Sequence, residues 1–241
     1  QTESNGMKCL YAGGDSWCEG DELGLPYDPI ATPVYRYKNS WPSLLATQLR
    51  IPITVNDGLR GTSGSRIYRR ATRFIRNWLQ HHRASDLTVV LGWTTLERDE
   101  VPIDVDYKGV KAAYYIPYHW HQYNLPTMSE RMTVESVVLE SLKRIHDSYT
   151  LTLGTTSREQ IQLERMLNLQ LLCDSVGVRL LQTWALDPDR TFCNTVPQLP
   201  VSFVEYCRQY GLATGSGGHG LESAHTQWAL TLKDYHDTVY S

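Results

Sequence analysis

Three short apolar runs, each followed by a turn of small residues, constrain the fold of this 241-residue chain. The runs cover residues 9–12, 51–55 and 87–91, and helix-like segments follow the first two. Continuous apolar runs of this length are typical of strands that a parallel sheet buries on both faces. Their alternation with helices predicts a single α/β domain over residues 1–241. We expect a three-layer α/β/α (flavodoxin-like), doubly wound parallel sheet with its functional site at the carboxyl edge.

The rest of the chain supplies further helices and one more strand. Residues 25–37, which contain Pro and Tyr, are expected to form a loop, and Ser40 is expected to cap the short helix that follows. Apolar residues at helical spacing predict longer helices, and a fourth apolar run predicts the last strand. The predicted helices cover residues 66–79, 134–145, 156–173, 203–210 and 225–235, and the predicted strand covers residues 178–183.

Residues 101–128 break this alternation and are rich in aromatic side chains. The stretch is too long for an ordinary connection, which predicts a lid or binding loop inserted after the third strand. Aromatic faces such as those of Tyr118 and Trp120 can stack on sugar rings or bases, although they can equally pack the insertion onto the domain. His119 and His121 flank Trp120 without a Cys or carboxylate at ligand spacing, so neither a metal site nor a cofactor is expected.

Composition argues against some classes of function. The formal net charge is −3 with 20% charged residues, which gives no global case for nucleic-acid binding. One helix carries arginines between Arg66 and Arg76, and a solvated face explains them better than a phosphate-binding surface, so nucleic-acid binding there is only a third alternative. No apolar window is long enough to span a bilayer, no signal peptide is visible, and the five scattered cysteines suggest reduced thiols.

The turn after the first apolar run, Gly13-Gly14-Asp15-Ser16-Trp17, carries a chemical signal. A serine at such a turn points out of the carboxyl edge of a parallel sheet, where open α/β sheets place their chemistry. Asp15 and Ser16 could equally be capping residues of a turn or helix. Near the other end of the chain, His219 lies in a glycine loop before the last helix, whereas His225 falls within that helix and is expected to cap or pack.

Four stretches of the chain form a set: Gly14-Asp15-Ser16, Gly61-Thr62-Ser63-Gly64, Gly92-Trp93-Thr94 with the Glu97-Arg98 pair after it, and His219. Together they resemble the sequence blocks of the SGNH (GDSL-type) hydrolase superfamily, and more narrowly the SGNH-like proteins that tailed bacteriophages encode. The resemblance implies that Ser16 is the nucleophile and His219 the general base of an ester hydrolase. It further implies that the N–H groups of Ser16 and Gly61, together with Thr94, hold the oxyanion.

Two of the four blocks depart from the family pattern. Thr94 stands where the family usually has Asn, and Ser216 stands where an Asp is expected three residues before the histidine. Either another group orients His219, such as Glu222 or a backbone carbonyl, or the site is a relic on a scaffold kept for binding or assembly.

These residues predict a serine esterase or deacetylase whose substrate is an O-acetylated carbohydrate or a small ester. The alternative is a catalytically degenerate SGNH-like virion protein that binds other phage proteins. Either protein would act in the phage virion or the host cytoplasm, without contact to a membrane. Substrate contacts are expected from residues beside the turns and in the aromatic insertion: Asp15, Trp17, Trp93, Tyr118 and Trp120.

Overall fold

A parallel sheet of four strands forms the centre of the computed structural model, which describes residues 7–24, 31–96, 98–107, 110–119, 155–186 and 198–240. The strands are β1 (Cys9–Gly14), β2 (Ile53–Asn56), β3 (Leu87–Trp93) and β6 (Arg179–Trp184). They lie in the order β2-β1-β3-β6, and every neighbouring pair is parallel. This order is typical of flavodoxin-like doubly wound sheets and confirms the predicted fold class.

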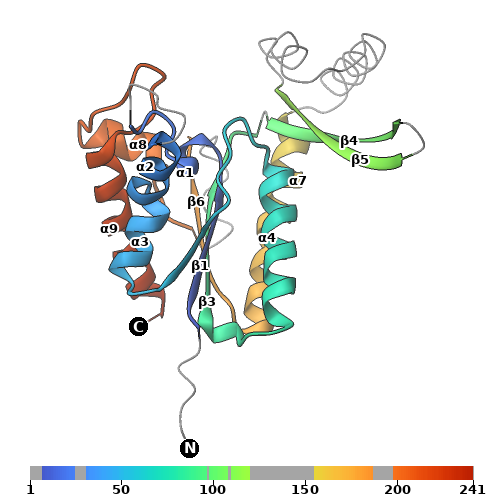
Figure 1. Cartoon of the computed structure of the whole chain (residues 1–241), viewed down its shortest axis with the longest axis horizontal. Coiled ribbons are helices and arrows are strands. Elements are labelled where there is room, and N and C mark those ends of the chain that lie inside the picture. The colour runs from blue at the N-terminus through green and yellow to red at the C-terminus, as the bar shows by residue number, and fades with distance from the viewer. Residues whose placement is uncertain are drawn as a thin grey trace, which may run out of the picture.

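Helices cover both faces of this sheet and give three layers (Figure 1). One face carries α4 (Gly64–Leu79) and α7 (Thr155–Val176), and the other carries α3 (Trp41–Gln48) and α9 (Glu222–Tyr240). Strand side chains alternate between the two faces, so Tyr11 packs in the core under α4 and α7 while Leu10 packs in the core under α3 and α9. Two cores built on one sheet are expected of this layered architecture.

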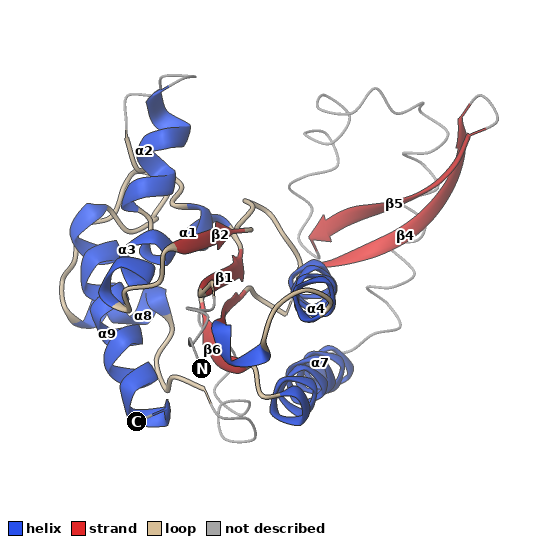
Figure 2. Cartoon of the chain, turned by 60° about the horizontal axis from the view of Figure 1, so that its bottom comes forward, coloured by secondary structure: helices blue, strands red, loops and turns tan. Residues whose placement is uncertain are grey.

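Three more helices complete the layer on the α3 and α9 side (Figure 2). They are α1 (Ser16–Glu19), α2 (Ala31–Asn39) and α8 (Phe203–Gln209). The loop expected over residues 25–37 is therefore wrong from Ala31 onward, and residues 25–30 lie outside the described part of the chain. The buried residues of α2 are Thr32 and Arg36, so its sequence offers no apolar stripe from which a helix could be predicted.

Polar contacts of Arg36 hold α2 in place. The Arg36 Nε donates to the carbonyl oxygen of Leu23 over 3.2 Å, and its Nη2 lies 3.2 Å from the Asp21 carboxylate. The Arg36 side chain is only 10% exposed, which makes this a shielded ion pair rather than a surface one. The charged side chain of Arg36 thus fixes α2 to the domain, whereas apolar side chains fix the longer helices.

The inserted segment, expected from the sequence to be a lid or binding loop over residues 101–128, begins as a β-hairpin. β4 (Arg98–Tyr107) and β5 (Val110–His119) pair antiparallel as a second, two-stranded sheet beside α4 (Figure 1). An ion pair of 2.7 Å between Arg69 of α4 and Glu100 of β4 anchors the hairpin. The rest of the expected insertion and the helix predicted over residues 134–145 lie outside the described residues.

His225 is a buried neutral histidine at the start of α9. Its side chain is fully buried, and its Nδ1 accepts a hydrogen bond from the Trp41 N–H over 3.1 Å. The ring also packs edge-on against Phe203. This is the packing role expected from the sequence. Burial, with a smaller contribution from the charge of His219, lowers the pKa of His225 to about 3.

This burial predicts a loss of stability in mild acid. The pKa of an exposed histidine is 6.5, so between about pH 6.5 and pH 3 the unfolded chain binds a proton at His225 that the folded chain does not. The free energy of unfolding is therefore expected to decrease as the pH is lowered from about 6.5 to 3, by as much as about 5 kcal/mol. Urea unfolding at several pH values tests this, with His225→Gln as the comparison. Equal pH slopes for the two proteins would contradict the prediction.

Candidate functional site

Ser16 lies at the carboxyl end of β1, on the first turn of α1. Asp15 caps this helix, because its Oδ1 accepts a hydrogen bond from the Trp17 N–H over 3.0 Å. The turn requires a glycine just before the cap, since a Cβ on Gly14 would come within 2.6 Å of the Cys18 Cβ. The capping role left open in the sequence thus belongs to Asp15, and the Ser16 hydroxyl is free to face the edge of the sheet.

The fold brings Ser16 and His219 together from opposite ends of the chain. The Ser16 Oγ lies 2.8 Å from the His219 Nε2, which is hydrogen-bond distance. Both side chains are largely shielded from solvent, with Ser16 6% exposed and the His219 side chain 18% exposed. This distance is the geometry that a histidine needs to take the proton of a serine hydroxyl.

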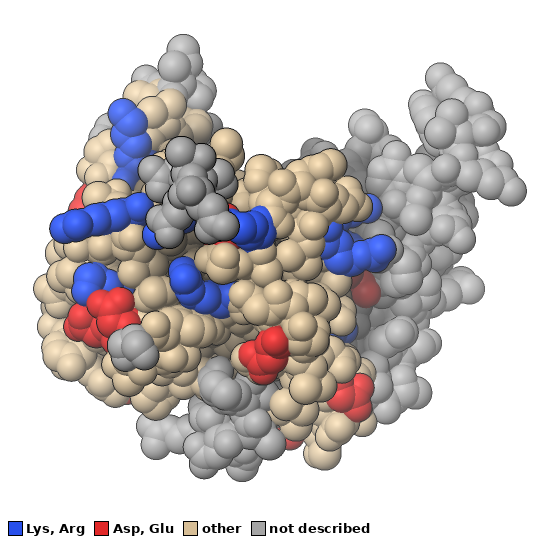
Figure 3. Space-filling model, turned by 90° about the horizontal axis from the view of Figure 1, so that it is seen from below, with Lys and Arg blue, Asp and Glu red and all other residues tan. Residues whose placement is uncertain are grey.

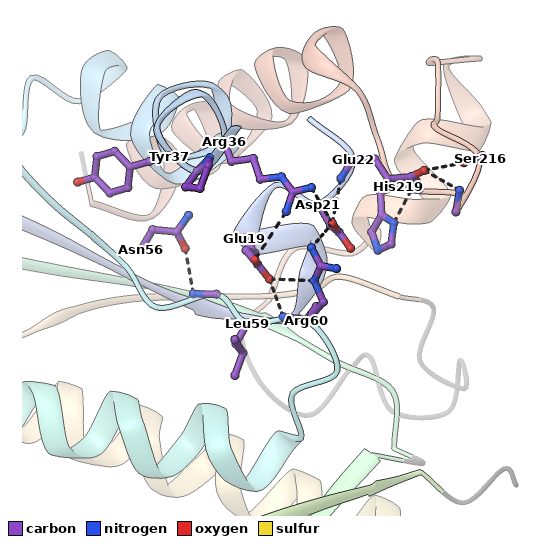
Figure 4. A pocket seen from close by; sticks show the side chains of 13 residues that line it. Glu19, Asp21, Glu22, Arg36, Tyr37, Asn56, Leu59, Arg60, Ser216 and His219 are labelled. Atoms are coloured by element: carbon purple, nitrogen blue, oxygen red, sulfur yellow. Dashed lines mark hydrogen bonds and ion pairs between the residues drawn. The ribbon is translucent and has the colours of Figure 1, made fainter. Parts of the chain in front are cut away.

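A carboxylate that sequence reasoning missed, Glu22, occupies the other side of the imidazole. Its Oε2 lies 3.2 Å from the His219 Nδ1 (Figure 4). Glu222, the carboxylate suggested from the sequence, instead accepts a hydrogen bond from the Tyr35 hydroxyl. The suggestion of Glu222 is therefore wrong, and the serine, the histidine and Glu22 form a continuous hydrogen-bonded row.

The glycine loop before α9 folds around the Glu22 carboxylate. Besides the imidazole, Glu22 accepts hydrogen bonds from the Gly217 N–H at 2.7 Å, the His219 N–H at 2.9 Å and the Ser216 hydroxyl at 3.2 Å. Ser216, which stands where an acid was expected three residues before His219, thus donates a hydrogen bond to Glu22, an acid from another part of the chain. Partial burial by itself raises the pKa of Glu22, but these hydrogen bonds outweigh it and lower the pKa below its ordinary value.

Glu22 reaches this position through an unusual backbone conformation. Its φ is 65°, in the left-handed region that residues other than glycine rarely adopt. Such conformations cost about 1–3 kcal/mol and are concentrated at functional sites. The loop also approaches closely, because a Cβ on Gly215 would lie 2.6 Å from the Glu22 carboxyl carbon. Both features indicate a geometry held by the surrounding structure.

Thr94 does not present its hydroxyl proton to the site, contrary to the expected oxyanion role. The Thr94 Oγ1 donates to the Asp15 Oδ2 over 3.0 Å. Arg98, at the start of β4, donates through Nη1 to both groups, at 3.3 Å to Asp15 and 3.2 Å to Thr94. Burial raises the pKa of Asp15, although the charge of Arg98 and hydrogen bonds from the Trp17 N–H and Thr94 oppose this. Because Asp15 is fully buried beneath these groups, its expected contact with substrate is also corrected.

The aromatic residues expected to bind substrate fall in three different places. Trp93 is fully buried and donates through Nε1 to Gln182, so it belongs to the core and its expected role is corrected. Trp17 lines the cleft beside Ser16, with its ring centroid 5.3 Å from that of His219. Tyr118 is the penultimate residue of β5, and Trp120 lies outside the described residues.

Gly61 lies in the β2–α4 loop with a φ of 69°. This loop is fixed against the segment that carries Ser16. The Leu59 N–H donates to the Gly14 carbonyl oxygen over 3.1 Å, and the Arg60 N–H donates to the Glu19 carboxylate over 2.7 Å. The expected second oxyanion donor is therefore in a loop held at the same edge of the sheet as the serine.

Two hollows meet at His219. One, of about 680 Å³, is lined by Ser16, Trp17 and Arg98 together with residues of α8 and the glycine loop. The other, of about 1050 Å³, lies on the Glu22 side and includes Glu19, Asp21, Glu22, Arg36 and Arg60 (Figure 4). Since the serine hydroxyl lines only the first hollow, this cleft is where a reacting group would bind.

The arginine-rich face of α4 is largely paired within the protein. Arg66 and Arg70 contact Asp57, and Arg69 contacts Glu100. Figure 3 shows lysine and arginine side chains interspersed with uncharged and acidic ones on the described part of the lower face. Much of the positive charge of this helix is thus neutralised by its own neighbours.

Other kinds of site are not visible in the described part of the chain. Its His, Cys, Asp and Glu side chains form no group of three or more that could hold a metal ion. None of the described helices combines the length and the hydropathy that a membrane crossing requires. Four cysteines, Cys9, Cys18, Cys173 and Cys207, are buried free thiols, in line with the expected reduced state, and Cys193 lies outside the described residues.

Comparisons with known proteins give the chain a family and several distant structural neighbours. A family profile described as a family of unknown function (DUF6071) matches residues 25–213, and no curated protein matches the chain. Among solved structures, the chain is similar to an acetyl xylan esterase from the rumen bacterium Butyrivibrio proteoclasticus, at 12% identity and a TM-score of 0.47, covering 96% of this chain and 64% of that one. It is also similar to a member of the lipolytic protein G-D-S-L family from Veillonella parvula, at 10% identity and a TM-score of 0.33, covering 97% and 98%. Likeness at this level does not define an activity, which has to be argued from the site.

Proposed function

The chain belongs to DUF6071, a family of unknown function, and we propose that it is a serine ester hydrolase that works through Ser16, His219 and Glu22. The observation that carries this proposal is the row of contacts from the Ser16 Oγ to the His219 Nε2 at 2.8 Å and from the His219 Nδ1 to Glu22 at 3.2 Å. Serine, histidine and a carboxylate in this order are the parts of a nucleophilic triad, which is recognised by geometry and not by sequence position.

Each member of the triad has a role set by its contacts. The His219 Nε2 takes the proton of the Ser16 hydroxyl as the Oγ attacks the acyl carbonyl carbon, and the imidazolium then gives that proton to the leaving alkoxide. Water hydrolyses the resulting acyl-enzyme by the same steps. Glu22 accepts the Nδ1–H, which fixes the tautomer that leaves Nε2 free to accept a proton and stabilises the imidazolium. The low pKa of Glu22 keeps it ionised for this role.

Backbone N–H groups are the proposed donors to the oxyanion. The Ser16 N–H lies at the first residue of α1, and the Gly61 N–H lies in the loop bonded to the same segment. Two such donors stabilise the tetrahedral intermediate, and removal of one donor costs about 10²–10³-fold in rate where this has been measured.

An O-acetylated carbohydrate is the proposed substrate class. Trp17 lines the cleft beside the nucleophile, but it is only 4% exposed and packs against Phe203, so it forms part of the cleft wall and not an open face for stacking on a sugar ring. The pairing of Arg98 with His119 places the end of β5 next to a residue of the cleft. Contact of Tyr118 and Trp120 with the sugar stays a prediction from the sequence.

A fluorophosphonate probe tests the proposal directly, since it labels only an activated serine. We expect stoichiometric labelling of Ser16, located by peptide mass spectrometry, and turnover of p-nitrophenyl acetate or of acetylated glycans. His219→Ala should slow the labelling by orders of magnitude. The alternative, a non-catalytic phage virion or partner-binding protein, predicts an unlabelled Ser16 and co-purification with an assembly.

The close approach of the glycine loop gives a further expected result. Gly215→Ala would place a methyl group 2.6 Å from the Glu22 carboxyl carbon, so the carboxylate has to move away from the imidazole. Misplacement by about 1 Å can cost about 10²-fold in rate, and kcat for p-nitrophenyl acetate is expected to fall by 10- to 100-fold. Gly177→Ala is the control, because Gly177 ends α7 with no atom near its added Cβ and should change stability without changing kcat. An unchanged kcat in Gly215→Ala would contradict the role of Glu22.

A further inference from the structure

Arg98 is fixed beside the nucleophile by two hydrogen bonds. Its Nη1 donates to the Asp15 Oδ2 and to the Thr94 Oγ1, and Asp15 is the residue immediately before Ser16. The Asp15 side chain is fully buried, so the Arg98 guanidinium is tied to a group that cannot move independently of the Ser16 turn. This contact brings the first residue of the inserted hairpin into the site.

The same guanidinium reaches the cleft in which the reaction is proposed to occur. Arg98 lines the hollow that contains Ser16 and His219, and its side chain is 24% exposed. A guanidinium carries five N–H donors, and its contacts with Asp15 and Thr94 in the described part of the chain use only Nη1. The Nη2 and Nε donors make no hydrogen bond within the described part of the chain and are therefore available to a group bound in the cleft.

The described lining of this cleft is positive. Its charged side chains are Arg98 and Arg208, and none of its described residues is Asp or Glu. Asp15 lies buried beneath Arg98, and Glu22 lies on the far side of the imidazole. Negative charge that develops on an acyl oxygen next to Ser16 would therefore meet a fixed cation in a partly water-shielded site, where such an interaction is strong.

We propose that Arg98 is a catalytic residue that donates a hydrogen bond to the oxyanion of the tetrahedral intermediate. This inference rests on the proposed ester hydrolysis by Ser16. Thr94 was expected from the sequence to hold the oxyanion, but it instead accepts a hydrogen bond from Arg98 and helps to hold that side chain in place. The inserted hairpin thereby supplies a group to the chemistry as well as to substrate binding.

The test uses an uncharged ester, so that any effect on the transition state is separated from recognition of substrate charge. With p-nitrophenyl acetate, Arg98→Ala is expected to lower kcat by about 10²–10³-fold with little change in KM. Guanidinium ion added at millimolar concentration should restore part of the lost rate, which a merely structural role would not allow. Arg69→Ala is the matched control, because it removes a different arginine contact of the hairpin, the ion pair with Glu100, and should leave kcat within about twofold.

Three outcomes would overturn the inference. A kcat within about twofold of wild type in Arg98→Ala would remove Arg98 from the chemistry while leaving the triad intact. A loss seen only with negatively charged esters, and mainly in KM, would make Arg98 a substrate-recognition residue. Turnover that survives Ser16→Ala would overturn the proposed function and this inference together.

Discussion

Ser16→Ala is expected to lower kcat/KM for p-nitrophenyl acetate by about 10⁴-fold or more, because the variant lacks the hydroxyl that is proposed to form the acyl-enzyme. The Ser16 side chain is small and 6% exposed, and within the described part of the chain its only side-chain hydrogen bond is to His219. The substitution therefore removes the reacting oxygen with little change in packing. Initial rates with purified protein, together with thermal unfolding, measure both effects.

A serine far from the cleft provides the control for this variant. Ser175 lies near the end of α7, where its hydroxyl donates to the Leu172 carbonyl oxygen, and Ser175→Ala should retain the wild-type rate. Equal rates for wild type and Ser16→Ala would show that the hydrolysis has another source, and the triad would have to be abandoned.

Glu22→Gln is expected to lower kcat by about 10³–10⁴-fold, with KM little changed. Glutamine has nearly the same shape, and its carbonyl oxygen can still accept N–H groups of the glycine loop. It carries no charge to stabilise the imidazolium, and its amide can donate to the His219 Nδ1 and so favour the wrong tautomer. Steady-state kinetics over a pH series measure the loss and show whether it is shared by kcat and kcat/KM.

Glu222 gives this variant a matched control. Glu222 was the carboxylate expected from the sequence to orient His219, but it accepts a hydrogen bond from the Tyr35 hydroxyl instead. Glu222→Gln should therefore leave kcat within about twofold. A loss in Glu222→Gln as large as that in Glu22→Gln, or no loss in either, would refute the assignment of Glu22 as the third member of the triad.

Most of the fold could be predicted because its elements follow apolar patterns. Continuous apolar runs marked β1 and β3, and the stripe that includes Ile67 and Ile75 marked α4. The helix α2 could not be predicted, because Arg36 holds it by polar contacts that depend on distant residues. The hairpin of β4 and β5 was also missed, since aromatic content alone does not distinguish a strand from an ordered loop.

The site could be predicted only where local turn chemistry specified it. Ser16 and His219 each lie in a glycine-containing turn next to a helix, and such turns are visible in a sequence. Glu22 meets the imidazole through a left-handed backbone and a loop almost 200 residues away, as its contact with His219 spans 197 positions. The hydrogen-bond partners of the Thr94 hydroxyl, Asp15 and Arg98, were likewise not visible in the sequence because they depend on tertiary contacts.

Ser16 begins the short helix α1 and Glu22 follows its end, so one stretch near the start of the chain holds two of the three groups. The imidazole arrives on a loop attached to α9, and that same loop binds the carboxylate. Detachment of the last helix would thus remove the base and uncover the acid in a single event. Under the proposed mechanism, a fragment ending before this loop is expected to be inert until a second fragment carrying it associates, so that ester turnover would report the docking of α9.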